Sequence, residues 1–489
     1  MTHRSRLQIA ITFILGIAAT ELSAQRPKAA DLIARAAHAM GGAAALDSLR
    51  NKTVEFNTVV YAVGQEETHL SPARATFSFG RTLTDYAGVR QMGTTESRAV
   101  TGATARLRRV TLSTMSMVET NGALQMDGPN VSLGLGRAQS LQIEQIVRAA
   151  VHHGSGWPVL APRTLRGELA DGVQMLLGPD TVSVWFDRTS ALPLASEIVT
   201  EDGVFGDRRT TTWYTRWQDA GGVKLPRQID VDYNGRPQTH TVLTSAAVNQ
   251  PIEQAQFAIP DSMVARAPRP PAAPPALTVT LVSLSPGIWR AEGGTHHSLV
   301  VEQGTGLLLV EGPQSAARTA AVLDTLRSRF SGRPVTGVVM THHHHDHSGG
   351  IRAYQARGIR VIAHHRNVDF VKGIAAARKT KAPDALSRGR PAPPAVGVRD
   401  SLVLGSGAGR VVLYPMASAH VEGLLGVWVP SAGAVFTSDV VNPAANQPLP
   451  RLGSSELVAF ARAVGIAPAK YVGGHGTLVD WPALEAAAR

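Results

Sequence analysis

The spacing of apolar and polar residues divides the chain into two parts. Between residues 51 and 260, short segments alternate apolar and polar positions, and this period of two predicts strands with one buried face. The predicted strands include Thr53–Val60, Ala75–Phe79, Arg106–Leu112, Thr181–Phe186, Thr210–Trp217 and Gln228–Tyr233. The Asp-Gly pair at 202–203 and the Asn-Gly pair at 234–235 are typical of hairpin turns. Residues 25–265 are therefore expected to form a mostly antiparallel β domain, with helices at 27–49, broken at Gly41-Gly42, and at 140–152.

From residue 277 onward, strand-like runs alternate with helical segments. Strands are expected at 278–284, 298–302, 307–310, 335–340 and 359–363 and near residues 401, 411, 425 and 434, and helices at 314–330, 351–357, 367–377, 454–464 and 481–488. This alternation predicts an α/β domain at 277–489 in which two sheets lie between two helical layers. Residues 266–276 are rich in proline, which cannot sustain a helix or a central strand, so an extended linker is expected there.

Composition narrows the choice of partners and ligands. The formal net charge of +11 raises the possibility of an anionic partner, but the basic residues are scattered, with no run interleaved with aromatic residues. Nucleic acid is therefore not expected as a partner. The chain has no cysteine, which excludes disulfides, thiolate metal ligands and a cysteine nucleophile.

The N-terminus has the features of a secretory signal peptide. Arg4 and Arg6 precede a short apolar stretch at 7–19, and Leu22-Ser-Ala24 supplies a small residue at the end of a cleavage site. The apolar stretch is shorter than the ~20 residues that span a bilayer. We therefore expect residues 1–24 to be removed, no transmembrane anchor after cleavage, and a periplasmic or secreted protein.

A histidine-rich loop is the most specific signal in the sequence. Residues 341–350 are Thr-His-His-His-His-Asp-His-Ser-Gly-Gly, between an expected strand and an expected helix. Residues two apart in an extended loop project to the same side, so His342 and His344 can reach one cation. The following turn directs Asp346 and His347 toward a second cation. A polyhistidine tag or an adventitious surface cluster would not explain the Asp-His-x-Gly-Gly continuation.

The pattern Thr-His-x-His-x-Asp-His-x-Gly-Gly resembles the signature of the metallo-β-lactamase superfamily. The resemblance covers residues 277–489 and implies three further ligands downstream, for which His420, Asp439 and His475 are the candidates. In the family pattern the full set of metal ligands is then His342, His344, Asp346, His347, His420, Asp439 and His475. The position after the third histidine is often serine or threonine in the family and is Val421 here, which leaves the metal ligands intact but removes a hydroxyl that could support them with a hydrogen bond.

These nitrogen and oxygen ligands suit two divalent cations, with zinc as the first choice and manganese or iron as alternatives. The resemblance implies a hydrolase in which a metal-bridging hydroxide attacks a small-molecule ester, lactone, thioester or phosphodiester-like substrate, with Asp346 orienting the water or accepting its proton. A bridging acid such as Asp439 is unusual in the family's β-lactamases, so antibiotic hydrolysis is disfavoured. A mononuclear iron enzyme that oxidises sulfur, similar to persulfide dioxygenases, is an alternative from another enzyme class.

The later part of the N-terminal region resembles, in pattern, the curved-sheet domains of outer-membrane lipoprotein sorting. The residues that carry this resemblance are Trp185-Phe-Asp-Arg-Thr189, Leu192-Pro193, Trp213-Tyr214, Gly221–Pro226 and Val248–Pro251. It implies a half-barrel that holds an acyl chain or another apolar ligand, so the substrate could be apolar or acylated. A purely structural β domain, or a non-enzymatic apolar-ligand-binding protein, is the alternative.

The remaining histidines are expected to have ordinary surface or packing roles, and those inside the loop are expected to point away from the metals. The first group comprises His296, His297, His364 and His365, and the second comprises His343 and His345. The first group lies at the ends of expected strands, so the alternative is that these histidines face the same pocket and contact substrate. Glu311, at the tip of an expected strand, is expected to fix a loop.

Overall fold

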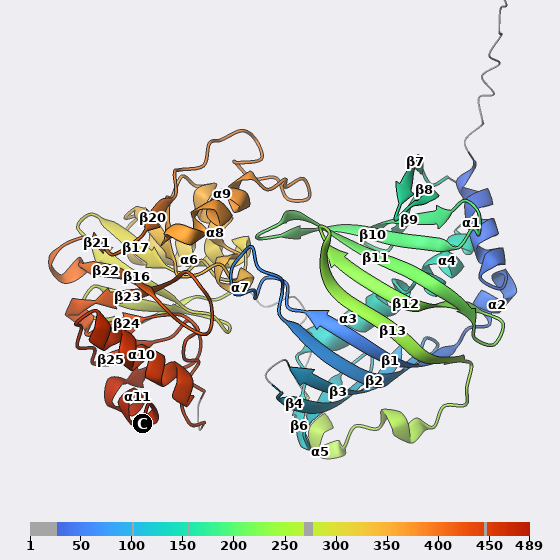
Figure 1. Cartoon of the computed structure of the whole chain (residues 1–489), viewed down its shortest axis with the longest axis horizontal. Coiled ribbons are helices and arrows are strands. Elements are labelled where there is room, and N and C mark those ends of the chain that lie inside the picture. The colour runs from blue at the N-terminus through green and yellow to red at the C-terminus, as the bar shows by residue number, and fades with distance from the viewer. Residues whose placement is uncertain (1–26, 100–101, 154–155, 268–276, 445–446) are drawn as a thin grey trace, which may run out of the picture.

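The computed structural model describes residues 27–99, 102–153, 156–267, 277–444 and 447–489. The predicted cleavage site after Ala24 and residues 268–276 of the predicted linker lie outside these ranges. The chain forms two domains that lie side by side and meet near helix α7 (Figure 1). Within the described ranges, no helix combines the length and apolar character that crossing a bilayer would require.

The N-terminal domain is built on one open antiparallel sheet of 13 strands. From β1, the chain adds strands outward to β6, passes through two helices to the opposite edge at β7, and returns strand by strand to β13, which pairs with β1. The strands are β1 (Asn51–Tyr61), β2 (Ala75–Asp85), β3 (Arg90–Ala99), β4 (Thr104–Thr111), β5 (Ser116–Thr120), β6 (Ala123–Met126), β7 (Val159–Leu165), β8 (Glu168–Leu177), β9 (Asp180–Asp187), β10 (Pro193–Asp202), β11 (Gly206–Asp219), β12 (Lys224–Tyr233) and β13 (Arg236–Val248). The sheet curves, as the half-barrel prediction requires (Figure 1).

Helices cover one face of this sheet. They are α1 (Ala29–Ala39), α2 (Ala43–Asp47), α3 (Pro129–Ser140) and α4 (Ile143–His152). The 3₁₀ turn η1 (Gln254–Phe257) packs through Phe257 against Leu83 and Met92 in a separate apolar cluster, and α5 (Asp261–Val264) lies beside β6. Leu32 of α1 and Ile146 of α4 pack in one core with Val173 of β8 and Val184 of β9. The predicted break between α1 and α2 is confirmed, because Gly41 and Gly42 both adopt positive φ, at 115° and 98°.

One helical prediction in this region was wrong at its boundary. The helix expected from residue 140 begins at Ile143, and Ser140 instead ends a separate helix, α3, that the sequence pattern did not predict. Gly134 and Gly136 lie within α3, and each glycine lowers helix propensity by about 1 kcal/mol relative to alanine. Packing of the buried Leu135 offsets this weakness.

The C-terminal domain contains two sheets. The first has seven strands in the order β14 (Thr280–Ser285), β15 (Ile288–Glu292), β16 (Ser298–Gln303), β17 (Gly306–Val310), β18 (Val335–Met340), β19 (Val361–His364) and β20 (Val396–Val398). The second has six strands in the order β21 (Leu402–Leu404), β22 (Val411–Met416), β23 (Leu424–Val429), β24 (Ala434–Phe436), β25 (Lys470–Val472) and β26 (Val479–Asp480). The helices are α6 (Ala316–Arg329), α7 (His345–Ser348), α8 (Ile351–Gln355), α9 (Val368–Ala376), α10 (Arg451–Ala463) and α11 (Trp481–Ala487), with 3₁₀ turns η2 (His365–Asn367), η3 (Gly407–Gly409) and η4 (Pro430–Ala432).

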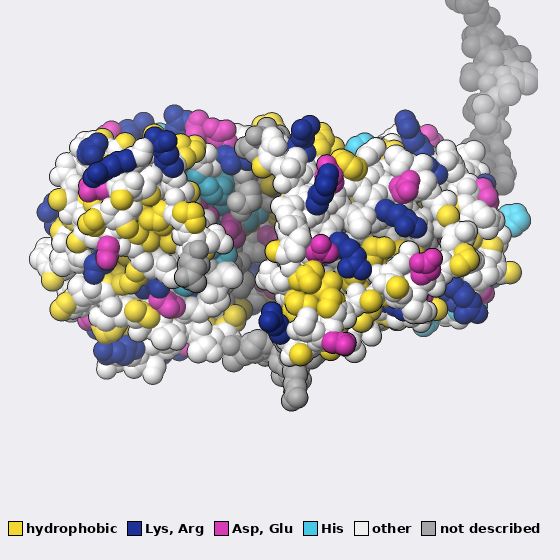
Figure 2. All heavy atoms as spheres, turned by 90° about the horizontal axis from the view of Figure 1, so that it is seen from below, with side chains coloured by type: hydrophobic (Ala, Val, Ile, Leu, Met, Phe, Trp, Pro, Cys, Tyr) yellow, Lys and Arg dark blue, Asp and Glu magenta, His cyan; other side chains and the backbone are white. Residues whose placement is uncertain are grey.

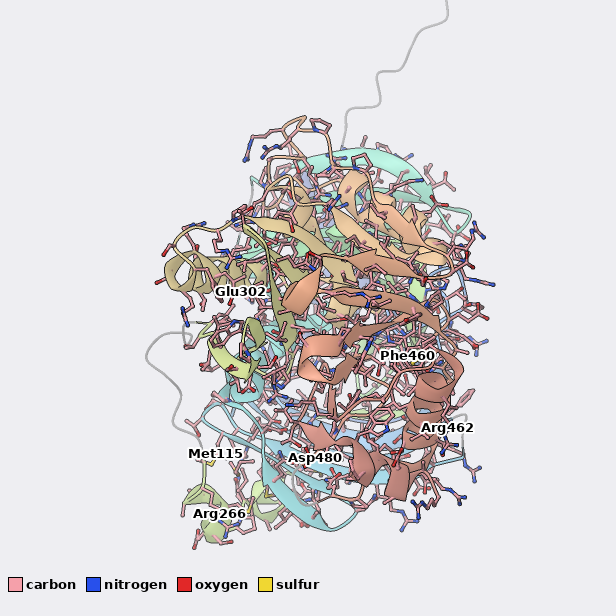
Figure 3. The ribbon with its side chains drawn as sticks, turned by 90° about the vertical axis from the view of Figure 1, so that its left-hand side faces the viewer. Met115, Arg266, Glu302, Phe460, Arg462 and Asp480 are labelled. Carbon is pink, nitrogen blue, oxygen red and sulfur yellow. The ribbon has the colours of Figure 1, made fainter. Side chains whose placement is uncertain are left out.

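Three apolar layers hold this domain together and confirm the predicted αββα order. Leu308 and Val339 of the first sheet meet Leu425 and Phe436 of the second in the central layer. On the outer faces, α6, α8 and α9 pack on the first sheet and α10 and α11 on the second. Figure 3 looks onto this side of the molecule, with Phe460 labelled on α10.

Candidate metal centre

The predicted ligands all follow the ends of strands. His342 and His344 come after β18, His420 after β22, Asp439 after β24 and His475 after β25. These loops meet at one edge of the sandwich, where a rigid framework presents flexible segments for chemistry. Figure 2 shows histidine side chains gathered in the hollow between the two domains.

His342, His344 and His420 form the first cluster, with one candidate ligand atom of each lying within 4.8 Å of the others. Nε2 of His342, Nδ1 of His344 and Nε2 of His420 are buried, and each lacks a hydrogen-bond partner among the described residues. Leaving a buried nitrogen unpaired costs about 1–3 kcal/mol, so three that converge on one point need a common explanation. A cation coordinated by all three supplies it, and the residues therefore fit the metal that the motif implies.

The second cluster comprises His296, Asp346, His347 and His475. Nε2 of His347 lies 3.2 Å from Nε2 of His475, so two ring nitrogens face each other as ligands of a shared cation would. Asp346 Oδ2 is 3.4 Å from His347 Nε2 and 3.2 Å from His296 Nε2. Asp346, His347 and His475 are thus brought together as predicted, and His296 joins them.

Asp439 lies between the two clusters. Its Oδ1 is 3.0 Å from His347 Nε2 and 3.3 Å from His475 Nε2, while its Oδ2 is 3.7 Å from His420 Nε2. One carboxylate oxygen thus faces each cluster, which is the arrangement that a bridging acid requires.

Glu311 supports both clusters from behind. Its side chain is fully buried, and its Oε2 accepts a hydrogen bond from His347 Nδ1 at 2.8 Å. Its Oε1 accepts a short hydrogen bond from Thr341 Oγ1, whose oxygen lies 3.0 Å from His342 Nδ1. If Thr341 accepts the His342 Nδ1 proton, Nε2 of His342 is left free for a cation. A carboxylate that orients ligating histidines in this way raises their basicity.

Two residues at this site have a strained backbone. Glu311 has φ 78° and Ser438 has φ 56°, a left-handed conformation that non-glycine residues rarely adopt. Ser438 lies beside Asp439, and its Oγ is 3.0 Å from His347 Nδ1. Such strain persists only where the surrounding structure enforces it, as around a functional site.

The electrostatics favour a cation. Burial, reinforced by neighbouring histidines, lowers the pKa of His342 well below its usual value, and burial lowers the pKa of His420 to about 4. Both imidazoles are therefore neutral near pH 7, the form that binds metal. Burial raises the pKa of Asp439, but hydrogen bonds from His347 and His475 outweigh it and hold that pKa well below its usual value. The carboxylate is therefore ionised.

His347 has the opposite shift. Burial lowers its pKa, but the carboxylates of Glu311, Asp346 and Asp439 outweigh burial and raise that pKa well above its usual value. The negative charge that stabilises a proton on His347 would equally stabilise a metal cation beside it.

The sequence predicted the roles of two supporting residues only in part. His296 was expected to have an ordinary surface or packing role, with a place facing the same pocket as the alternative, and it lies in the second cluster. Glu311 fixes the histidine loop, as expected, but its direct contact with the candidate ligand His347 was not predicted. The signal that could have found both is strand order. The start of β16 pairs with the end of β17, which lies beside the end of β18, so residues just before β16 and just after β17 share the edge of the histidine loop.

Other histidines follow the prediction. The rings of His343 and His345 pack near Phe370 and are absent from the candidate clusters. His364 Nδ1 accepts a hydrogen bond from the backbone of Arg366 at 3.2 Å, a packing role. Val421 is fully buried in the apolar layer beneath α10.

A separate cavity of about 920 Å³ lies over β1 to β5 of the N-terminal domain. Its walls combine apolar residues such as Phe56 and Phe79 with charged ones. The charged lining residues are Glu55, Arg81, Glu96, Arg106, Arg108 and Glu119. An apolar ligand for this domain stays a prediction.

Comparison with known proteins identifies the class to which this fold and site belong. Residues 291–482 match the family model of the metallo-beta-lactamase superfamily, a range that begins in β15 and extends into α11. The C-terminal domain therefore belongs to the metallo-beta-lactamase superfamily, whose members are typically hydrolases.

Similar solved structures include several metallo-beta-lactamases. The enzyme from Pontibacter korlensis is 17% identical over 43% of this chain and 97% of its own, with a TM-score of 0.35. FIM-1 from Pseudomonas aeruginosa is 19% identical over 44% of this chain and 95% of its own, with a TM-score of 0.35. TMB-1 is 17% identical over 43% of this chain and 95% of its own, with a TM-score of 0.34.

Proposed function

We propose that this protein is an exported, dinuclear metal-dependent hydrolase that cleaves an ester, lactone, thioester or phosphodiester-like bond in a small molecule. The observation that carries the proposal is the set of three buried, unpaired ring nitrogens of His342, His344 and His420, with a second cluster of ligands beside it and Asp439 between the two. Zn²⁺ is the first candidate for both positions, because every ligand is nitrogen or oxygen.

Two such cations, when bound, would lower the pKa of a coordinated water to about 7 and offset negative charge on the substrate. The protein would hold the first cation through His342, His344 and His420, and the second through Asp346, His347 and His475. Asp439 would face both. His296 is placed to contact the second position.

Asp346 would orient the attacking water. Burial raises its pKa, but hydrogen bonds from His296, His347 and Gln65 outweigh burial and hold that pKa below its usual value. A carboxylate with a low pKa stays ionised and can accept a hydrogen bond from water, but it is a weak general base. We therefore assign Asp346 to positioning the water rather than to storing its proton.

Substrate would enter from the side of Asp346, His420 and His475. Their side chains are 35%, 24% and 21% exposed, whereas His342 and His344 are almost wholly buried. A pocket with partly exposed residues at its entrance and buried residues at its base can admit a small molecule.

The test is metal-dependent hydrolysis. Protein stripped of metal should be inactive on a panel of lactones, thioesters and phosphodiesters, and about two equivalents of Zn²⁺ should restore activity on at least one member. Asp439→Asn should lose most of this activity, whereas Glu302→Gln, on the far end of β16, should keep it. A fully loaded protein that is inactive across the panel would contradict the proposal. Export has its own test: the mature protein isolated from its native cell should begin at Gln25.

A further inference from the structure

The loop between β1 and β2, residues 62–74, extends from the N-terminal domain to the metal centre of the other domain. Figure 1 shows this blue loop lying against α7. The Gly64 carbonyl accepts a hydrogen bond from His345 N at 3.0 Å, and the Glu67 carbonyl accepts one from Glu422 N at 2.8 Å. Arg74 donates to the His420 carbonyl at 2.9 Å. The β1–β2 loop thus contacts the segments that carry both His344 and His420.

One contact fixes a ligand directly. Nε2 of His344 lies 2.9 Å from the Glu66 carbonyl oxygen, which can only accept, so Nε2 carries the proton. Nδ1 of His344 is then the lone-pair nitrogen, and it is the atom that lies buried and unpaired in the first cluster. The hydrogen bond that sets the tautomer of this ligand therefore comes from the N-terminal domain.

A second contact involves Asp346. The Gln65 side-chain amide donates to Asp346 Oδ1 at 2.7 Å, while Oδ2 of the same carboxylate faces His347. Gln65 thereby fixes the rotation of Asp346, because one carboxylate oxygen is held by the Gln65 amide and the other faces the second cluster.

The loop is held rigidly enough for this role. Glu66 is 1% exposed, accepts a hydrogen bond from Gly64 N at 2.9 Å and pairs with Arg236 of β13. Gly64 has φ 90°, and a Cβ there would lie 2.4 Å from Cγ of His345, so only glycine allows this approach.

A second group of contacts fixes the domains on the other side of α7. Thr380 donates through its backbone N and its hydroxyl to Asp207, each at 2.7 Å. Lys379 pairs with Glu201 at 2.6 Å. The backbone of Gly203 lies so close to Gly349 that a Cβ at Gly203 would be 2.1 Å from the Gly349 carbonyl oxygen.

We propose that the N-terminal domain is a structural part of the metal centre: the β1–β2 loop supplies the Glu66 carbonyl and the Gln65 amide as positioning groups, and the C-terminal domain alone holds an incomplete site. This inference rests on the proposed function, since it assigns these groups a role toward the same cations. It explains why the two domains share one chain and why a loop of the β domain reaches so far from its own sheet.

The experiment compares two variants of the full-length chain with the wild type. In the first, residues 62–74 are replaced by Asn-Gly, a turn that can join β1 to β2 because Tyr61 and Ala75 already pair across the hairpin. In the second, Gln65→Ala removes only the amide. Gln125→Ala, at an exposed position of β6, is the matched control.

Each protein is stripped of metal, titrated with Zn²⁺ against a chromophoric chelator, and loaded with Co²⁺ for its visible absorption spectrum. We expect the loop replacement to weaken Zn²⁺ binding at both sites, by about 10- to 100-fold at each, and to change the Co²⁺ spectrum, as loss of an outer hydrogen bond does. Gln65→Ala should lower kcat more than it raises KM and should change the Co²⁺ spectrum, because it alters the orientation of Asp346. Gln125→Ala should match the wild type.

The outcomes separate this inference from the proposed function. Wild-type protein that binds no Zn²⁺ specifically would contradict the proposed function itself. Wild-type protein that binds Zn²⁺ while the folded loop variant shows the same affinities and Co²⁺ spectrum would overturn the role of the loop alone. If the loop variant does not fold, Gln65→Ala decides: unchanged kcat and spectrum overturn the proposal.

Discussion

Replacement of Glu311 by glutamine should weaken metal binding without unfolding the protein. The carboxylate is fully buried and serves two partners, Thr341 Oγ1 and His347 Nδ1. Glutamine has almost the same volume, so the substitution leaves no cavity, but it offers one oxygen where glutamate offers two. Its NH₂ group must then face one of the two partners.

Either orientation disturbs a ligand. An NH₂ group that faces His347 makes Nδ1 an acceptor and moves the ring proton to Nε2, the atom that lies 3.0 Å from Asp439 Oδ1. An NH₂ group that faces Thr341 removes the acceptor for its hydroxyl and releases His342 Nδ1. A hydrogen bond to a charged group contributes about 1.5–3 kcal/mol, so the loss corresponds to about a 10- to 100-fold weaker cation affinity.

Competition titration of the metal-free protein with Zn²⁺ and a chromophoric chelator measures this change. Glu302→Gln is the matched control, because Glu302, labelled in Figure 3, lies at the far end of β16. It pairs with Arg333. Thermal unfolding of each metal-free protein shows whether the fold is retained. Equal affinities in the wild type and Glu311→Gln, or an equal loss in Glu302→Gln, would refute the reasoning about Glu311.

Two further predictions concern a neighbouring ligand and the stability of the domain. His296→Gln should weaken the second Zn²⁺ several-fold and leave the first unchanged, because His296 contacts only the cluster of Asp346; unchanged titration of both sites would show that His296 is not a ligand. Arg352→Met should lower the free energy of unfolding, measured with a chemical denaturant, by about 3 kcal/mol. The substitution breaks a largely buried ion pair with Asp384 and three hydrogen bonds from Arg352 to carbonyls at the end of α9. Burial raises the pKa of Asp384, but Arg352 outweighs burial and lowers it to about 2 from 3.8. The pKa of Asp384 is lower in the folded protein than in the unfolded chain, so the ion pair contributes its full stabilisation above about pH 4 and loses it as the pH falls toward 2. The difference in free energy of unfolding between the wild type and Arg352→Met should therefore shrink over that range.

Local sequence patterns predicted much of the fold and the site because the physics there is local. The period of two gave most strands of the N-terminal sheet, and the histidine motif predicted which side chains the structure brings together in the two clusters. Three features escaped prediction. Helix α3 is weakened by Gly134 and Gly136 and depends on packing rather than on propensity. His296 reaches the site only through the order of strands in the sheet.

The third feature is the contact between domains. No periodicity in residues 62–74 indicates that Gln65 and the Glu66 carbonyl will meet Asp346 and His344, which lie 281 and 278 positions away along the chain. Such a contact depends on how the surfaces of the two folded domains pack against each other, and no local pattern in a single sequence indicates it.

The most direct test of the central claim is the metal content of the purified mature protein, measured by elemental analysis beside a His342→Ala, Asp346→Ala double variant. We predict about two zinc or manganese ions per chain in the wild type and their loss in the variant. One iron per chain would favour the sulfur-oxidising alternative. A wild-type protein without specifically bound metal would contradict the assignment of His342, His344, Asp346, His347, His420, Asp439 and His475 as ligands.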